Sequence, residues 1–264
     1  QFANYFADWS NFIVEGDFET GSGYTPTDVK IFHLLDSSYP TIYPENEIRN
    51  DTLTLTRATS IDSRLEYYKY TTNKGILNEE RDVNLFSTYF NKRMFSENDW
   101  WLPENKIIIF TDTETKYLMA EAKLMMGENT TAANILNQSP AKNTRTDLGF
   151  DLPAVRNQRI QSNGLTGNHS YDGSESIAEF QLALLREYSV ELEGLGGVGL
   201  QWFFMRRHDL LQEGTATMSP IPESELLEQG MPHYTFGGVE NAGQNGTASG
   251  ANSWKNLRAK IDGQ

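Results

Sequence analysis

The stretch SENDWWLPEN at 96–105 brings together the residue types that recognise sugars. Trp100 and Trp101 are adjacent, and Asn98 and Asp99 stand directly before them. A flat aromatic ring packs against the C–H face of a sugar ring, while planar polar groups bond the hydroxyls. Adjacent side chains of an extended loop point in opposite directions, so one tryptophan can face the core while the other is exposed. The alternative is that both tryptophans only pack.

A second candidate lies at 36–47 in DSSYPTIYPENE, where Tyr39 and Tyr43 each precede a proline. A proline restricts the backbone of the residue before it, which makes such a loop stiff. A stiff loop holds an aromatic ring ready for stacking, although packing into the core is again the alternative. These two tyrosines complete the set of candidate ligand-binding residues.

Residue patterns for catalysis or metal binding are missing. Paired acids such as Glu191 and Glu193 carry little information in an acidic chain, and a glycosidase needs two carboxyls at a fixed separation in a cleft. The four histidines show no metal-ligand spacing, Gly-x-Ser-x-Gly does not occur, and there are no cysteines. We therefore expect no enzyme, no cofactor and no metal site.

The segment QWFFMRR at 201–207 places aromatic residues directly against two arginines. We expect a short helix that buries the aromatic side chains against a helical hairpin predicted at 106–138. The arginine stems would then extend toward carboxylates such as Glu187 or Glu191. The aromatic residues are Trp202, Phe203 and Phe204. Direct contact of this segment with a ligand is the less favoured alternative.

The composition limits the partners. The chain has 264 residues, 38 % of them hydrophobic, and a formal net charge of −14. Nucleic acid and anionic lipid surfaces need a basic footprint, so neither is expected as the main partner. The charge fits a neutral or cationic ligand, or solubility alone. No 18-residue apolar run is present, and the first residues do not form a signal peptide.

The elements that must position these residues differ along the chain. Residues 1–105 form a loop-rich aromatic part, with a short strand expected at 51–61 and short helices or turns at 62–70 and 78–90. Residues 106–226 form a helical scaffold part, and the Asn/Gly/Ser-rich segment 237–264 is expected to be a flexible tail.

A helical hairpin is predicted over 106–138. Tyr117, Ala120 and Leu124 share one face, and a second apolar row lies beside it. The members of that second row are Leu118, Ala122 and Met125. Gly127 ends the first helix, Asn129 or Thr130 caps the next, and small alanines let the two helices approach closely. The second helix carries Ala132, Ala133 and Leu136.

Residues 139–173 read as a long polar loop, after which a new helix begins. Ser176 and Glu179 form a capping box. An apolar stripe follows and runs to about Glu193, and a second short helix is expected at 200–214. The stripe consists of Ile177, Phe180, Leu184 and Tyr188.

Several motifs in this order resemble the SusD/RagB family, the surface nutrient-binding lipoproteins of Bacteroidetes-type bacteria. They are DSRL at 62–65, the alanine-rich helix pair at 114–137, Glu187 with Glu191–Leu192, WFFMRR at 202–207, and PIPESEL at 220–226. The chain departs from the pattern at Phe204, where the family has Asp, at Tyr188, where it has Arg, and in the glycine-rich LGGVG at 195–199.

The resemblance implies one mainly α-helical, tetratricopeptide-like domain with long decorating loops and a few short strands. It implies cell-surface binding of oligosaccharides at the outer membrane, for uptake through a partner TonB-dependent, SusC-like transporter. It further implies that the family's N-terminal half, with its lipid anchor, lies outside this chain. The alternatives are a helical-repeat module for protein–protein interaction and a peptide-nutrient binder of the same family.

Overall fold

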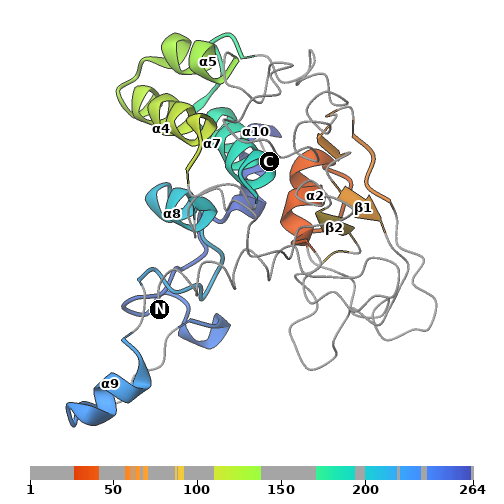
Figure 1. The fold of residues 1–264 in the computed structure, drawn as a ribbon. Coiled ribbons are helices and arrows are strands. Elements are labelled where there is room, and N and C mark those ends of the chain that lie inside the picture. The colour runs from red at the N-terminus through yellow and green to blue at the C-terminus, as the bar shows by residue number, and fades with distance from the viewer. Residues whose placement is uncertain are drawn as a thin grey trace, which may run out of the picture. The chain divides into compact units, whose positions relative to one another are not determined.

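The computed structural model describes residues 27–41, 57–60, 62, 64–65, 68–70, 87, 89–91, 110–137, 171–193, 200–218, 221–232 and 237–262. The described part of the chain is mainly helical, as predicted (Figure 1). None of its helices has the length and apolar character needed to cross a bilayer. The chain divides into two compact units, residues 1–174 with 186–197 and residues 175–185 with 198–264. Each unit is described by itself.

The first unit contains an aromatic core around helix α2 (Val29–Leu35), which the sequence did not predict. Asp28 caps this helix by accepting a hydrogen bond from the amide of Lys30 at 2.8 Å. The ring of Phe32 stacks on Tyr89 with centroids 4.1 Å apart and meets Tyr68 edge-on at 5.0 Å. The α2 helix therefore forms because it buries its apolar side chains in a layer of tyrosines.

Two short strands lie beside this core, where helices or turns were predicted. Strand β1 (Tyr68–Tyr70) pairs antiparallel with β2 (Tyr89–Asn91), and Tyr70 stands opposite Tyr89. The prediction was wrong because both segments are rich in tyrosine and phenylalanine, which pack well on a pleated surface. Of the strand expected at 51–61, the structure describes residues 57–60, which form no regular element.

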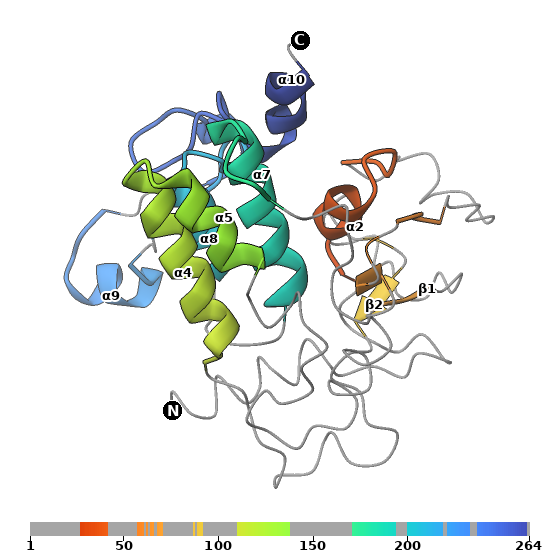
Figure 2. The same cartoon turned by 90° about the horizontal axis from the view of Figure 1, so that it is seen from above.

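The predicted hairpin is present as α4 (Asp112–Met125) and α5 (Asn129–Asn137), which lie side by side in both views (Figure 2). Thr111 caps α4 by accepting from the amide of Glu114 at 3.0 Å. At its other end Gly127 adopts φ +74°, and the amides of Gly127 and Glu128 donate to the carbonyls of Leu124 and Lys123. This pairing is a Schellman motif, and it ends the helix at the predicted glycine.

The predicted shared face of the hairpin is buried. Tyr117, Ala120 and Leu124 are buried, as are the alanines and Leu136 of α5. The second apolar row, which lies beside this face, is exposed at Leu118, Ala122 and Met125, at Met125 by 71 %. α5 begins at Asn129, so Glu128 occupies the position before the helix, where its carboxylate pairs with Lys123 at 2.9 Å.

One further helical turn completes the described scaffold of the first unit. The π-helical turn η5 (Glu187–Glu191) packs against α4. The rings of Tyr117 and Tyr188 meet at 5.7 Å, and the Tyr188 hydroxyl donates to Glu121 at 3.1 Å. The packing of η5 on α4 brings two glutamates of this turn toward the hairpin.

In the second unit, helix α7 (Ile177–Arg186) contributes its residues up to Leu185. The capping box is confirmed, since the Ser176 amide donates to Glu179 at 2.6 Å and the Glu179 amide donates to the Ser176 hydroxyl at 3.3 Å. Phe180 and Leu184 are buried as predicted, whereas Ile177 is exposed. The first residue of the stripe lies in the first turn of the helix, where it reaches solvent.

Helix α8 (Leu200–Arg207) begins at the predicted residue, but it ends before the predicted residue 214 and turns a different face inward. Phe204 and Met205 are buried, Trp202 is half-buried, and Phe203 is 45 % exposed. The prediction that this helix buries Phe203 was wrong. Three consecutive helical residues span about 200° of the helix circumference, so they cannot all face one core.

The segment predicted to be a flexible tail has defined structure. Residues after α9 (Glu223–Glu228) form η6 (Val239–Asn241), η7 (Trp254–Asn256) and α10 (Leu257–Asp262). Backbone hydrogen bonds join Gly214 to Ala248 at 2.9 Å and Trp254 to Leu210 at 2.9 Å. A Cβ on Gly214 would lie 2.0 Å from the carbonyl oxygen of Gly238. The glycines here therefore permit close backbone packing, where the composition suggested disorder.

Candidate functional site

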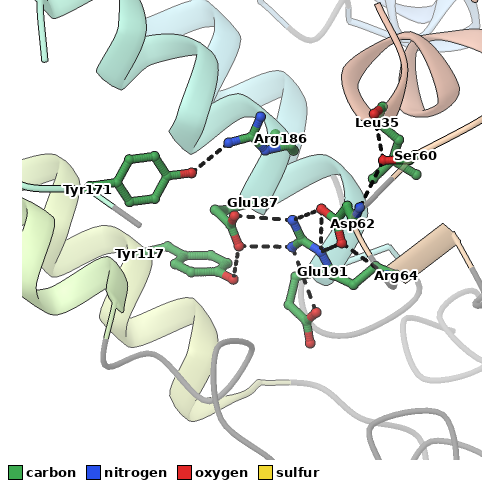
Figure 3. Close-up of polar contacts among 9 residues, drawn as sticks. All are labelled: Leu35, Ser60, Asp62, Arg64, Tyr117, Tyr171, Arg186, Glu187 and Glu191. Carbon is green, nitrogen blue, oxygen red and sulfur yellow. Dashed lines mark hydrogen bonds and ion pairs between the residues drawn. The ribbon is translucent and has the colours of Figure 1, made fainter. Parts of the chain in front are cut away.

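The most concentrated polar chemistry of the described residues lies around Arg64 in the first unit (Figure 3). Its Nη1 and Nη2 donate to the two carboxylate oxygens of Glu187 at 2.9 and 3.2 Å. Its Nε and Nη2 donate to Asp62 at 3.1 and 2.8 Å. A third carboxylate, Glu191, approaches Nη1 at 3.9 Å. One guanidinium thus holds two carboxylates by paired hydrogen bonds and a third by charge.

Local structure explains how these groups meet. Glu187 and Glu191 are four residues apart on η5, so both side chains leave the same side of the helical turn. Asp62 also accepts from the backbone amide of Arg64 at 3.0 Å, which fixes the turn that carries the arginine. Ser60 extends the arrangement by donating to the carbonyl of Leu35 at the end of α2. The network therefore joins α2, the DSRL segment and η5.

The helical hairpin is joined to the same network. The hydroxyl of Tyr117 on α4 donates to Glu187 at 2.7 Å. Arg186 donates to the hydroxyl of Tyr171 at 2.6 Å, and the backbone of Tyr171 exchanges two hydrogen bonds with the side chain of Asn137 on α5. α4 is thereby tied to η5 directly, and α5 is tied through Tyr171 to Arg186, the residue before η5.

Burial and neighbouring charges together set the pKa values of this cluster. Burial would raise the pKa of Asp62, but the positive charge and hydrogen bonds of Arg64 outweigh it and hold that pKa below its ordinary value. Burial raises the pKa of Tyr117 well above its ordinary value, and the negative charges of Glu187 and Glu191 raise it further. Arg64 stays protonated, because the charges of Asp62 and Glu187 outweigh burial and raise its pKa.

The network is closed to solvent. Arg64 is 1 % exposed, and the side chains of Asp62, Glu187 and Glu191 are fully buried. A carboxylate that is already bonded to a buried guanidinium offers no accessible lone pair to a substrate. The arrangement is therefore suited to holding segments together, since removal of one partner would leave an uncompensated charge inside the protein.

The structure places one of the predicted ligand-binding residues in the core. Tyr39 is 3 % exposed, and its ring packs on Phe32 and Tyr89 with centroids 5.5 and 6.3 Å away. A ring enclosed in this way has no free face for a sugar, so the expectation of an exposed Tyr39 is corrected. The remaining candidates lie outside the described residues; they are Tyr43, Asn98, Asp99, Trp100 and Trp101.

Arg206, one of the two arginines of α8, makes a ring contact within its own helix. Arg206 is exposed, and its guanidinium lies over the ring of Trp202 at 5.4 Å. Glu187, which was expected to receive an α8 arginine, instead takes the paired hydrogen bonds of Arg64. Sequence reasoning missed Arg64 as the partner, although the DSRL motif at 62–65 was the signal that pointed to it.

The two histidines in the described part of the chain make one hydrogen bond and one ring contact. His33 contacts the carbonyl oxygen of Tyr39 through Nδ1 at 2.6 Å, and the ring of His208 packs on Phe204 at 4.6 Å. Among the described residues, no group of three or more acidic, histidine or cysteine side chains is arranged to hold a metal ion.

In comparisons with known proteins, no family model, no curated protein and no solved structure matches this chain.

Proposed function

We propose that the chain is a non-catalytic binding protein with a tetratricopeptide-like scaffold of the SusD/RagB type. It captures oligosaccharides at the surface of the outer membrane and passes them to a TonB-dependent, SusC-like transporter. One observation carries the proposal. Two motifs on which the resemblance rests, DSRL and the glutamates of η5, meet in the buried network of Arg64.

That meeting supports the proposal because the motifs are far apart in the chain. Arg64 and Glu187 are separated by 123 positions, yet their side chains form two hydrogen bonds. A motif match by chance gives no reason for the matched residues to contact one another. A signature that specifies a scaffold does give that reason, since its charged residues need one another once they are buried.

The role of the network also favours binding over catalysis. The most concentrated acidic cluster of the described residues is sealed around Arg64, so it serves the fold. Under this proposal, aromatic and amide side chains on loops recognise the oligosaccharide by stacking and hydrogen bonding. Trp100, Trp101, Asn98, Asp99 and Tyr43 remain the proposed ligand contacts.

A glycan panel tests the proposal. The intact protein is applied to immobilised neutral and acidic oligosaccharides, and the strongest binder is titrated by calorimetry against Trp100→Ala and Trp101→Ala. We expect one of the two to lower the affinity about tenfold, as loss of an aromatic anchor does. Met126→Ala, on an exposed position, is the matched control and is expected to bind normally. A folded wild-type protein that binds no oligosaccharide of the panel would refute the proposal.

A second function, protein–protein interaction, is favoured by one surface. Apolar side chains cover the solvent side of α4, and we name this set the α4 apolar face; it comprises Leu118, Met119, Ala122, Met125 and Met126. Contiguous apolar exposure of this kind is typical of interaction sites. The longer methionine side chains adapt to varied partners.

Cross-linking in native membranes separates the two functions. If the α4 apolar face binds a protein, Met125→Glu abolishes a cross-linked partner that Thr131→Glu, an exposed substitution on α5, retains. Retention of the same partner by both variants would reject this second function. The glycan panel is unaffected by either substitution under the first proposal.

A further inference from the structure

Helix α8 presents an aromatic and basic face that the Arg64 network does not involve. Phe203 is exposed, and its ring meets Trp202 edge-on with centroids 5.0 Å apart. Arg206 lies over the same Trp202 ring at 5.4 Å. The ring of Phe203 and the guanidinium of Arg206 therefore both contact the indole of Trp202, and all three side chains belong to one helix.

This face is held in place from beneath. The indole Nε1 of Trp202 donates to the carbonyl of Ala216 at 3.0 Å, which fixes the orientation of the ring. Phe204 and Met205 anchor the opposite side of the helix in the core. At the end of α8 the amide of Leu210 donates to the carbonyl of Met205 at 2.7 Å, which closes the last turn. A recognition surface built this way needs little ordering when it binds.

The charge of the face contrasts with that of the chain. Arg206 and Arg207 are both exposed in a protein of net charge −14. Within the described ranges no carboxylate lies in ion-pair distance of Arg206, and its guanidinium contacts the indole of Trp202. The planar guanidinium of Arg206 is exposed to solvent, and two of its N–H groups can donate parallel hydrogen bonds to one carboxylate.

We infer that this face of α8 binds an oligosaccharide that contains uronic acid. The C–H face of one sugar ring stacks on Phe203, and a sugar carboxylate pairs with Arg206. A neutral sugar could stack on the Phe203 ring but has no carboxylate to pair with the guanidinium of Arg206. The inference rests on the proposed function and narrows its substrate class.

A matched pair of probes tests it on the full chain. The first probe is the tetramer of α-1,4-linked galacturonic acid. The second is the same tetramer with every carboxylate methyl-esterified, which removes the charge and keeps the rings. We expect calorimetry at low salt to show about tenfold tighter binding of the acid, the effect of a charge-assisted paired hydrogen bond. That preference should weaken as salt is added.

Substitutions then locate the site. Phe203→Ala and Arg206→Gln are each expected to weaken binding of the acid about tenfold. Arg206→Gln should leave binding of the ester nearly unchanged. Lys116→Gln removes one positive charge from α4 and is the control for general electrostatics, with an expected change below about twofold. Urea unfolding of each variant verifies that it is folded.

The outcomes separate this inference from the proposed function. Equal binding of acid and ester, or full binding by Phe203→Ala and Arg206→Gln, overturns the α8 site while oligosaccharide binding stands. Binding of other oligosaccharides but neither tetramer has the same meaning. If no oligosaccharide of the wider panel binds, both the proposed function and the α8 site are refuted.

Discussion

Arg64 in the first unit and Arg206 in the second carry the same guanidinium in opposite surroundings. Arg64 is buried and holds Asp62 and Glu187 by paired hydrogen bonds, whereas Arg206 is exposed and lies over Trp202. The carboxylates within reach decide between these roles. A guanidinium among three acids can be buried, because its charge is compensated there. One beside an aromatic ring keeps its donors in water, where a ligand can reach them.

The two units also differ in the contacts that join their segments. In the first unit, side-chain charges join distant segments, with Tyr117 and Tyr188 filling the space around them. In the second unit, the loops after α8 are joined mainly through the backbone, as at Gly214 and Ala248. We therefore expect the first unit to be sensitive to charge and pH, and the second to be sensitive to added side-chain volume.

The largest expected effect is that of Arg64→Met. It leaves Asp62 and Glu187 buried without their partner, which costs about 3–5 kcal/mol in the free energy of unfolding. The measurement is urea denaturation followed by circular dichroism. Arg206→Met is the matched control, with an expected change within about 0.5 kcal/mol. Equal destabilisation by the two variants would remove the contrast between the arginines. Arg64→Lys, which keeps the charge but loses the fork, should fall between them.

Gly214→Ala tests the backbone packing of the second unit. Gly214 has φ +74°, and its Cβ would collide with the carbonyl oxygen of Gly238. We expect a loss of about 2–4 kcal/mol from the clash and the backbone strain together. Gly230→Ala is the control, since Gly230 has φ +63° but open space around it; only the backbone strain of about 1–2 kcal/mol applies. A Gly214→Ala variant no less stable than Gly230→Ala would contradict the close packing.

Tyr117→Phe sharpens the expected pH dependence of the first unit. At neutral pH it removes the hydrogen bond to Glu187, at a cost of about 1–3 kcal/mol. The pKa of Tyr117 is raised in the folded protein, so its contribution is present below the unfolded value of about 10 and is lost as the pH rises through the folded pKa. The variant should therefore lose less stability than the wild type between about pH 10 and 12. Parallel curves would exclude this role. The raised pKa of Tyr171 leaves a residual slope in both proteins.

Local patterns predicted the hairpin of α4 and α5 and the start of α7. The stripe Tyr117, Ala120, Leu124 and the capping box of Ser176 both depend on residues within one or two turns, and both are present. The same is true of Gly127, whose left-handed conformation is a local requirement of the helix end. These features need no knowledge of what the helix packs against.

Features that depend on distant partners were not predictable in the same way. Helix α8 buries Phe204 and Met205, and the side chains that pack on them determine which face points inward. The spacing of apolar residues within an eight-residue helix does not show which face that is. Tyr39 was expected on a loop surface, but it is buried against Phe32 of α2 and Tyr89 of β2. The acid partners of Arg64 were named in the sequence as motif residues, yet their pairing spans 123 positions. Sequence spacing alone does not reveal such a pairing.

The chain order of the Arg64 network has a consequence for dividing this protein into fragments. The first unit is discontinuous, because the chain leaves it after Ser174 and returns at Arg186. A fragment that stops at residue 174 keeps Asp62, Arg64 and Tyr117 but lacks the helical turn that carries Glu187 and Glu191. Neither unit can therefore be produced intact by a single cut. Truncations or fusions intended to isolate the hairpin need to retain residues 186–191, either in place or grafted after α5.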